Sequence, residues 1–102
     1  MEIIESLNWR YATKVFDKNK EISDTDLQKI KDIMRLSASS FGLQPWKFLI
    51  VEDKKIREKL KPVSWGQSQI TDASILVVMC RIDKVDNRYI EKYLDSIIDI
   101  RG

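Results

Sequence analysis

Apolar residues recur every three or four positions in several stretches of the chain, which is the spacing of one face of a helix. This pattern predicts four helices, over residues 2–8, 23–36, 52–61 and 88–101. A shorter segment of one or two helical turns is expected over residues 67–72. Helices therefore account for most of the regular structure that we expect.

Two continuous apolar runs predict strands, over residues 46–51 and 74–80. The second run has no polar interruption between Ile75 and Met79, which is typical of a strand buried on both faces. Two strands with several helices indicate the α+β class. Because a two-stranded sheet is only marginally stable by itself, the apolar stripe of the last helix needs a partner to cover it.

Local signals refine where the helices begin and which side they bury. Ser23 is a favourable N-cap, and Asp26 stands where the acid of a capping box would lie. In the third helix, Ile56 and Leu60 are spaced to form the buried face. Gly102 follows the last helix at the position that a C-terminal glycine usually occupies.

Composition excludes several kinds of site. The 102 residues include 18 basic and 16 acidic side chains, no histidine and one cysteine, Cys80. Without histidine there is no imidazole base, and zinc sites built on histidine or on several cysteines are excluded. Cys80 lies inside an apolar run, where a small buried hydrophobic residue is the simpler interpretation than a reactive thiol.

Charge and hydropathy also bear on partners and compartment. The net charge of +2 is spread along the chain, and no basic face with interleaved aromatic residues indicates nucleic-acid binding. No apolar run has membrane-spanning length, and the charged N-terminus lacks the apolar segment of a signal peptide. We therefore expect no membrane partner and a reducing, cytoplasmic compartment.

Residues 37–46, Ser-Ala-Ser-Ser-Phe-Gly-Leu-Gln-Pro-Trp, connect a predicted helix to a predicted strand. Pro45 favours an extended conformation for Gln44, so the helix is expected to end before this step. Hydroxyl groups and free backbone N–H groups in such a loop suit an anionic or oxygen-rich ligand. An ordinary helix-to-strand connection explains the same residues.

Arg10 and Lys14 form a second candidate site near the N-terminus. In a partly extended segment, alternate residues share one side of the backbone, so Arg10, Ala12 and Lys14 would point the same way. An arginine fork and a lysine point charge there would suit a phosphate group. Two solvated surface charges are the alternative, and the spacing alone does not decide between them.

The two motifs together resemble the nitroreductase family of FMN-dependent oxidoreductases. Members typically carry Arg-x-Ser-x-Lys-x-Phe and later Ser-Pro-Ser-Ser-x-x-x-Gln-Pro-Trp, to which residues 10–16 and 37–46 are similar in order and separation. A third similarity covers residues 67–74, before an apolar strand. Ala12 and Ala38 depart from the usual serine and proline.

The resemblance implies a nitroreductase-like mixed sheet flanked by helices, of which this chain covers about the first half as a single partial domain. The chain is then either a fragment or a natural truncation, and the sequence leaves both open. In the family, FMN is reduced by NADH or NADPH and passes electrons to small acceptors such as nitroaromatics or quinones by a ping-pong route. Since the cofactor supplies this chemistry, a chain without histidine remains a candidate enzyme.

Partners follow from the same resemblance. It implies a homodimer with long helices at the interface and FMN bound between subunits.

The alternative function is a truncated, non-catalytic module for flavin binding or dimerisation. A nucleic-acid-binding domain is a third interpretation, which depends only on the slightly basic charge balance.

The resemblance also assigns roles to residues. It places Arg10 and Lys14 at the FMN phosphate, with Tyr11 and Ala12 beside the cofactor. Ala12 lacks the usual hydroxyl, and a neutral hydrogen bond contributes about 0.5–1.5 kcal/mol, so FMN binding would be weakened and not abolished.

The remaining assigned residues come from the second and third motifs. Ser39 and Ser40, with backbone groups that include Ala38, are expected to meet the flavin or its ribityl chain. Either Gln67 or Gln69 is expected at the pyrimidine edge. The aromatic residues assigned to the substrate face are Phe41 and Trp65, for which core packing is the alternative.

Overall fold

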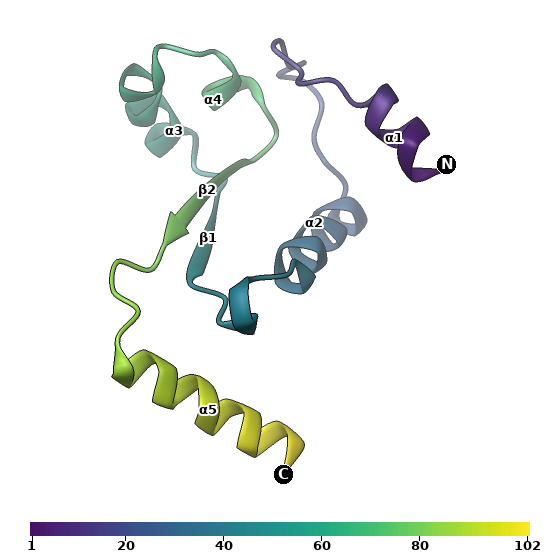
Figure 1. Ribbon diagram of the computed structural model, residues 1–102. Coiled ribbons are helices and arrows are strands. Elements are labelled where there is room, and N and C mark those ends of the chain that lie inside the picture. The colour runs from purple at the N-terminus through teal and green to yellow at the C-terminus, as the bar shows by residue number, and fades with distance from the viewer. The chain divides into compact units, whose positions relative to one another are not determined.

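The computed structural model describes residues 1–102. The α-helices are α1 (Ile3–Trp9), α2 (Asp24–Leu36), α3 (Lys54–Leu60), α4 (Gln69–Asp72) and α5 (Asn87–Arg101) (Figure 1). The strands are β1 (Trp46–Val51) and β2 (Leu76–Arg81), and two 3-10 turns are η1 (Ser40–Gly42) and η2 (Pro62–Ser64). The predicted elements are thus all present, with ends shifted by at most two residues.

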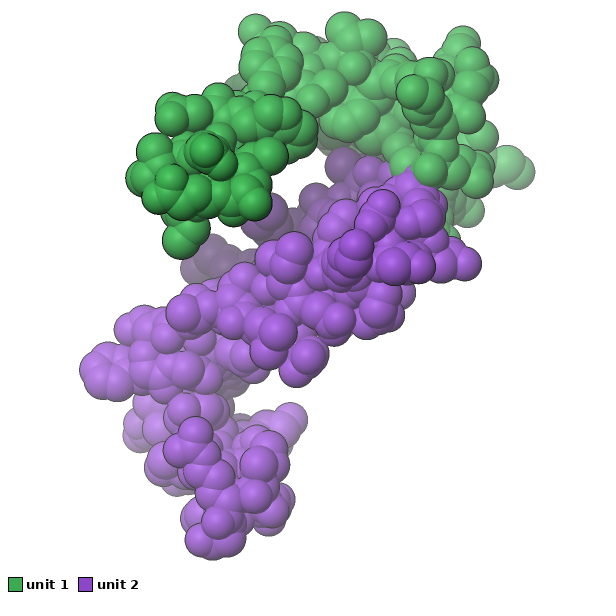
Figure 2. All heavy atoms as spheres, turned by 90° about the vertical axis from the view of Figure 1, so that its right-hand side faces the viewer, with its two compact units in different colours: residues 1–21, 52–74 green, residues 22–51, 75–102 purple.

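The chain divides into two compact units, which are coloured separately in Figure 2. Unit 1 comprises residues 1–21 and 52–74, and unit 2 comprises residues 22–51 and 75–102. Unit 1 therefore contains α1, α3, η2 and α4, whereas unit 2 contains both strands, α2, η1 and α5.

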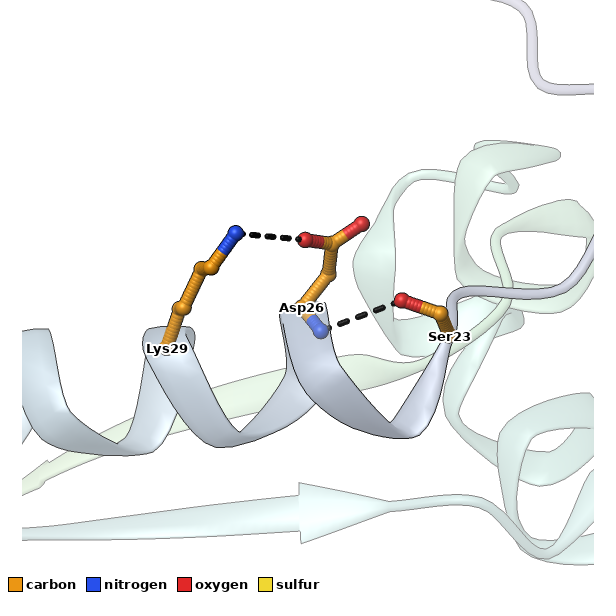
Figure 3. Close-up of polar contacts among 3 residues, drawn as sticks. All are labelled: Ser23, Asp26 and Lys29. Carbon is orange, nitrogen blue, oxygen red and sulfur yellow. Dashed lines mark hydrogen bonds and ion pairs between the residues drawn. The ribbon is translucent and has the colours of Figure 1, made fainter.

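The start of α2 is capped as the sequence predicts. The Ser23 hydroxyl accepts a hydrogen bond from the Asp26 backbone N–H at 3.1 Å, which satisfies one of the free donors of the first turn (Figure 3). The expected capping box is replaced by a different contact, because the Asp26 carboxylate pairs with Lys29 Nζ at 3.4 Å. Asp has a shorter side chain than the usual Glu, and its exposed pair with Lys29 contributes little stability.

Helix α3 in unit 1 buries a different residue from those predicted. Its N-cap is Asp53, whose carboxylate accepts from the backbone N–H groups of Lys55 at 2.8 Å and Ile56 at 3.1 Å. Ile56 is half exposed, and Leu60 is only partly buried. Arg57 is instead the buried residue of this helix, at 2% exposure. The prediction of an Ile56–Leu60 buried face was therefore wrong, since hydrogen bonding of the Arg57 guanidinium decides which side faces inward.

The sheet of unit 2 consists of β1 and β2 paired antiparallel, with Trp46 opposite Arg81 and Val51 opposite Leu76 (Figure 1). The prediction that the second strand is buried on both faces was wrong. No residue of β2 is fully buried, and Met79 is 79% exposed. A sheet of only two strands offers too few neighbours to cover an apolar run on both faces.

No apolar residue of the chain is fully buried. The stripe of α5 illustrates this, since Ile90, Leu94 and Ile98 are 39%, 50% and 62% exposed. Tyr93 and Ile97 of the same stripe are partly buried, so the stripe has few partners within the chain, as expected from the sequence. None of the helices has the length and apolar content needed to cross a membrane.

Candidate functional site

The predicted site residues are distributed over both units. Unit 1 contains the first and third motifs, and unit 2 contains the loop of residues 37–46, which we call the serine loop. The candidates in unit 1 are Arg10, Tyr11, Ala12, Lys14, Trp65, Gln67 and Gln69. Those in unit 2 are Ala38, Ser39, Ser40 and Phe41.

The segment from Arg10 to Lys14 follows α1 and has no regular secondary structure. Only the Arg10 backbone is held there, by a hydrogen bond from its N–H to the Ser6 carbonyl at 3.0 Å. All five residues are exposed, and neither cationic side chain makes a hydrogen bond or an ion pair. Both positive charges are therefore available to an anionic ligand.

The third motif, residues 67–74, begins after η2 and contains all of α4 and the turn that follows it. The Gln67 side-chain nitrogen donates to the Ser64 carbonyl at 3.2 Å, so part of its amide is already engaged. Gln69 is the first residue of α4 and is half-buried. Trp65 is 93% exposed and has a left-handed backbone with φ of 60°. Its exposure excludes core packing for this ring within the chain.

The serine loop contains its own hydrogen bonds. Ser39 Oγ accepts from the Gln44 backbone N–H at 2.9 Å, and the Gln44 side chain donates to the Arg35 carbonyl at 3.3 Å. Gln44 has φ of 47°, so the predicted extended conformation was wrong. These two hydrogen bonds help to hold a conformation that the following proline disfavours.

Two further residues of the loop have positive φ. Phe41 is left-handed, with φ of 55° and ψ of 16°, and Gly42 has φ of 67°. A side chain added at Gly42 would lie 3.0 Å from the Tyr93 hydroxyl. Glycine is therefore needed there both for the backbone conformation and for the close approach of Tyr93.

Sequence reasoning missed the two tyrosines that hold this loop. The Tyr93 hydroxyl donates to the Phe41 carbonyl at 2.9 Å. The Tyr89 hydroxyl lies 2.5 Å from the Leu43 carbonyl and 3.1 Å from the Gln44 carbonyl. The spacing of these residues on α5 was the available signal, because tyrosines four apart share one helix face. The sequence gives no indication of which carbonyls they reach.

Arg57 of unit 1 was also missed. Its guanidinium donates to the backbone carbonyls of Ile70 at 2.8 Å, Ser74 at 3.2 Å and Ala73. These contacts fix the end of α4 and the turn after it, and they engage three of the five guanidinium N–H donors. Arg57 also lines a polar pocket of about 500 Å³ within unit 1, together with Lys54, Lys61 and Asp72.

The chemistry available from these residues is binding chemistry. Unit 1 offers two free cations and two side-chain amides, and unit 2 offers two hydroxyls and an exposed ring on a held loop. The cations of unit 1 suit a phosphate group, and the hydroxyls and exposed ring of unit 2 suit a planar, oxygen-rich ligand. With no histidine in the chain, proton transfer by imidazole is not part of this chemistry.

Comparison with known proteins identifies the family. The sequence profile of the Nitroreductase family matches residues 7–98. The chain belongs to the nitroreductase family. The resemblance inferred from the three motifs is thereby confirmed. A putative NAD(P)H nitroreductase of Staphylococcus haemolyticus is 42% identical to this chain over 98 residues.

Solved structures of nitroreductases share the fold. The putative nitroreductase YdfN of Bacillus subtilis has a TM-score of 0.78 and 24% identity over 95% of this chain. A putative nitroreductase of Exiguobacterium sibiricum, solved in complex with FMN, has a TM-score of 0.72 and 22% identity over 97% of this chain. The predicted nitroreductase-like α+β fold is therefore confirmed.

The chain spans less than half the length of these nitroreductases. It covers 45% of the Staphylococcus haemolyticus protein, 45% of YdfN and 47% of the Exiguobacterium sibiricum protein. The confirmed fold is thus a partial one, which agrees with the sequence-based prediction.

Proposed function

We propose that this protein is a cytoplasmic FMN-dependent oxidoreductase that uses NAD(P)H to reduce nitroaromatics, quinones or similar small acceptors by a ping-pong route. The match of the nitroreductase family to residues 7–98 is the observation that carries this proposal. The named relative and the neighbour solved with FMN support it at the level of the family.

The residues present fit the phosphate of FMN. Arg10 and Lys14 are exposed and have no carboxylate partner, so binding a phosphate would not require an existing ion pair to break. Charge-assisted hydrogen bonds contribute about 1.5–3 kcal/mol each, which makes this pair the strongest anchor available in the first motif.

The polar groups of the other motifs fit the rest of the cofactor. The Ser40 hydroxyl makes no hydrogen bond within the chain, and Ser39 accepts one while its own hydrogen remains available. With the backbone of Ala38, these groups would bind the ribityl chain or the ring. Gln67 or Gln69 would donate to the pyrimidine edge, where a donor stabilises negative charge.

The bound flavin would supply the redox chemistry, accepting a hydride from NAD(P)H and delivering electrons to the acceptor. The chain's own residues would bind and orient. Phe41 and Trp65 are 89% and 93% exposed, so their rings are free to stack on a planar nicotinamide or acceptor. Tyr11, at 71% exposure, is proposed to lie beside the cofactor near Arg10.

Cofactor content tests the proposal directly. We expect the purified protein to be yellow and to lose its visible absorbance when NAD(P)H is added without oxygen. Steady-state oxidation of NAD(P)H with menadione then distinguishes an enzyme from a flavin-binding module without catalysis. A colourless protein that takes up no added FMN under native conditions would contradict the assignment.

We further propose that the protein is a homodimer that binds FMN at its interface. The exposed stripe of Ile90, Leu94 and Ile98 on α5 supports this, because apolar surface of that extent is usually covered. Light scattering is expected to give twice the chain mass, and Leu94→Glu to give the monomer mass. Ser96→Glu, an added charge on the same helix, is the control. A Leu94→Glu protein that keeps the dimer mass would exclude this surface as the interface.

A further inference from the structure

Helix α5 presents two hydroxyl groups to one short loop. Tyr89 and Tyr93 are one turn apart on this helix, and both side chains are partly buried. Their hydroxyls reach the carbonyls of Phe41, Leu43 and Gln44, which precede them by 45 to 52 residues. A long-range contact therefore controls the backbone of the serine loop.

The backbone that these tyrosines hold is unfavourable. Phe41 and Gln44 have φ of 55° and 47°, in the left-handed region that residues with a side chain seldom adopt. Such conformations persist only where surrounding contacts enforce them, and they cluster at functional sites. The tyrosine hydroxyls and the Ser39–Gln44 hydrogen bond are the enforcing contacts here.

Packing of the loop does not explain the strain. The Phe41 side chain is 89% exposed, so no buried apolar area within the chain offsets its unfavourable backbone. The strained loop instead presents an exposed ring next to Ser40, whose hydroxyl is free, and Ser39. These are the groups that a planar, oxygen-rich ligand would contact.

We propose that Tyr89 and Tyr93 are positioning residues, which hold the serine loop in its ligand-binding conformation; this inference rests on the flavin-binding function proposed above. Neither tyrosine touches the cofactor in this proposal. The pair acts through the loop, by keeping the Ser39 and Ser40 hydroxyls and the Phe41 ring preorganised. Without the pair, the loop would relax to unstrained conformations, and apparent affinity would fall in proportion to the fraction of binding-competent loop.

Removing only the hydroxyls tests this proposal on the intact protein. Tyr89→Phe, Tyr93→Phe and the double variant keep the rings and delete the hydrogen bonds to the loop. Ser96→Ala deletes an exposed hydroxyl of the same helix that makes no hydrogen bond to the loop, and it serves as the matched control. Amide hydrogen exchange of residues 38–46 in the FMN-free protein reports the loop directly. Three further measurements show whether the binding site is changed. They are the FMN dissociation constant, the circular dichroism of the bound flavin and the KM for menadione.

We expect each tyrosine variant to speed exchange in the loop and to raise the FMN dissociation constant by about two- to tenfold, with a larger effect for the double variant. The flavin dichroism and the KM for menadione should change, whereas Ser96→Ala should match the wild type in every measurement. These results would support the proposal.

Two results would overturn it. Unchanged loop exchange in the double variant would show that the tyrosines do not hold the loop. Faster exchange with unchanged FMN affinity, dichroism and KM would show that they stabilise the fold and do not position the site. Failure of the wild type itself to bind FMN is a distinct outcome, which overturns the proposed function and this inference with it.

Discussion

The turn that follows α4 and the segment that follows α1 belong to the same unit, and an arginine contacts the first and lies in the second. Arg57 is 2% exposed, and its guanidinium donates to three backbone carbonyls around the α4 turn. Arg10 is exposed and donates to nothing through its side chain. The side chain of the same type of residue is thus bonded to the protein in one region and unbonded in the other.

This difference separates structural charge from charge available for binding. The last carbonyls of a helix have no partner within it, so a buried donor such as Arg57 satisfies groups that would otherwise be costly to bury. Arg10 satisfies no group of the protein, and its five donors remain free for a ligand. Substitutions at the two arginines should therefore affect different properties.

The largest effect is expected for Arg57→Met, which keeps the length of the side chain and removes the donors. An unsatisfied buried carbonyl costs about 1–3 kcal/mol, and three part-buried carbonyls lose a donor here, so the free energy of unfolding should fall by about 3 kcal/mol or more. Urea unfolding measures this change. Arg10→Met is the control and should change it by less than about 0.5 kcal/mol. Similar losses for both variants would remove the distinction between the two regions.

Arg10→Ala should instead weaken cofactor binding. Loss of a charge-assisted hydrogen bond corresponds to about ten- to a hundredfold in the FMN dissociation constant. Riboflavin, which has no phosphate, should lose far less, and titration of both ligands by flavin fluorescence makes the comparison. Equal losses for FMN and riboflavin would indicate a general defect and not a phosphate contact.

A smaller effect is expected for Lys14→Gln. Lysine is a point charge without the planar fork of arginine, so we expect the FMN dissociation constant to rise by about three- to tenfold. Lys18→Gln removes the same charge from the neighbouring exposed linker and is the matched control. If both variants weaken FMN binding to the same degree, overall charge and not a contact at Lys14 is responsible.

Much of the local structure was predictable from the sequence. The Ser23 cap, the proline at 62 and the apolar spacing placed α2, α3 and both strands within a few residues. These signals act between residues that are close along the chain, so a short window contains them. The three motifs predicted the family for the same reason, because each is a continuous segment.

The candidate site was predictable only as a set of residues. The roles of Arg10, Lys14 and the serines remain predictions, whereas Gln44 and Ile56 show where local reasoning failed. Proline at 45 predicts an extended Gln44, but hydrogen bonds to Ser39 and Arg35 determine its backbone. Apolar spacing predicts a buried Ile56, but carbonyls 13 to 17 residues away bury Arg57 instead.

The sequence by itself thus determined the class of fold, the order of the elements, the family and the candidate residues. The tertiary structure alone decided which arginine is buried, which backbone is left-handed and which tyrosines hold the serine loop. The buried arginine and the tyrosine contacts depend on hydrogen bonds between residues distant along the chain, and the backbone of Gln44 depends also on bonds to Ser39 and Arg35. Such bonds form only after folding has brought a particular donor to a particular carbonyl, and no periodicity or propensity encodes that pairing.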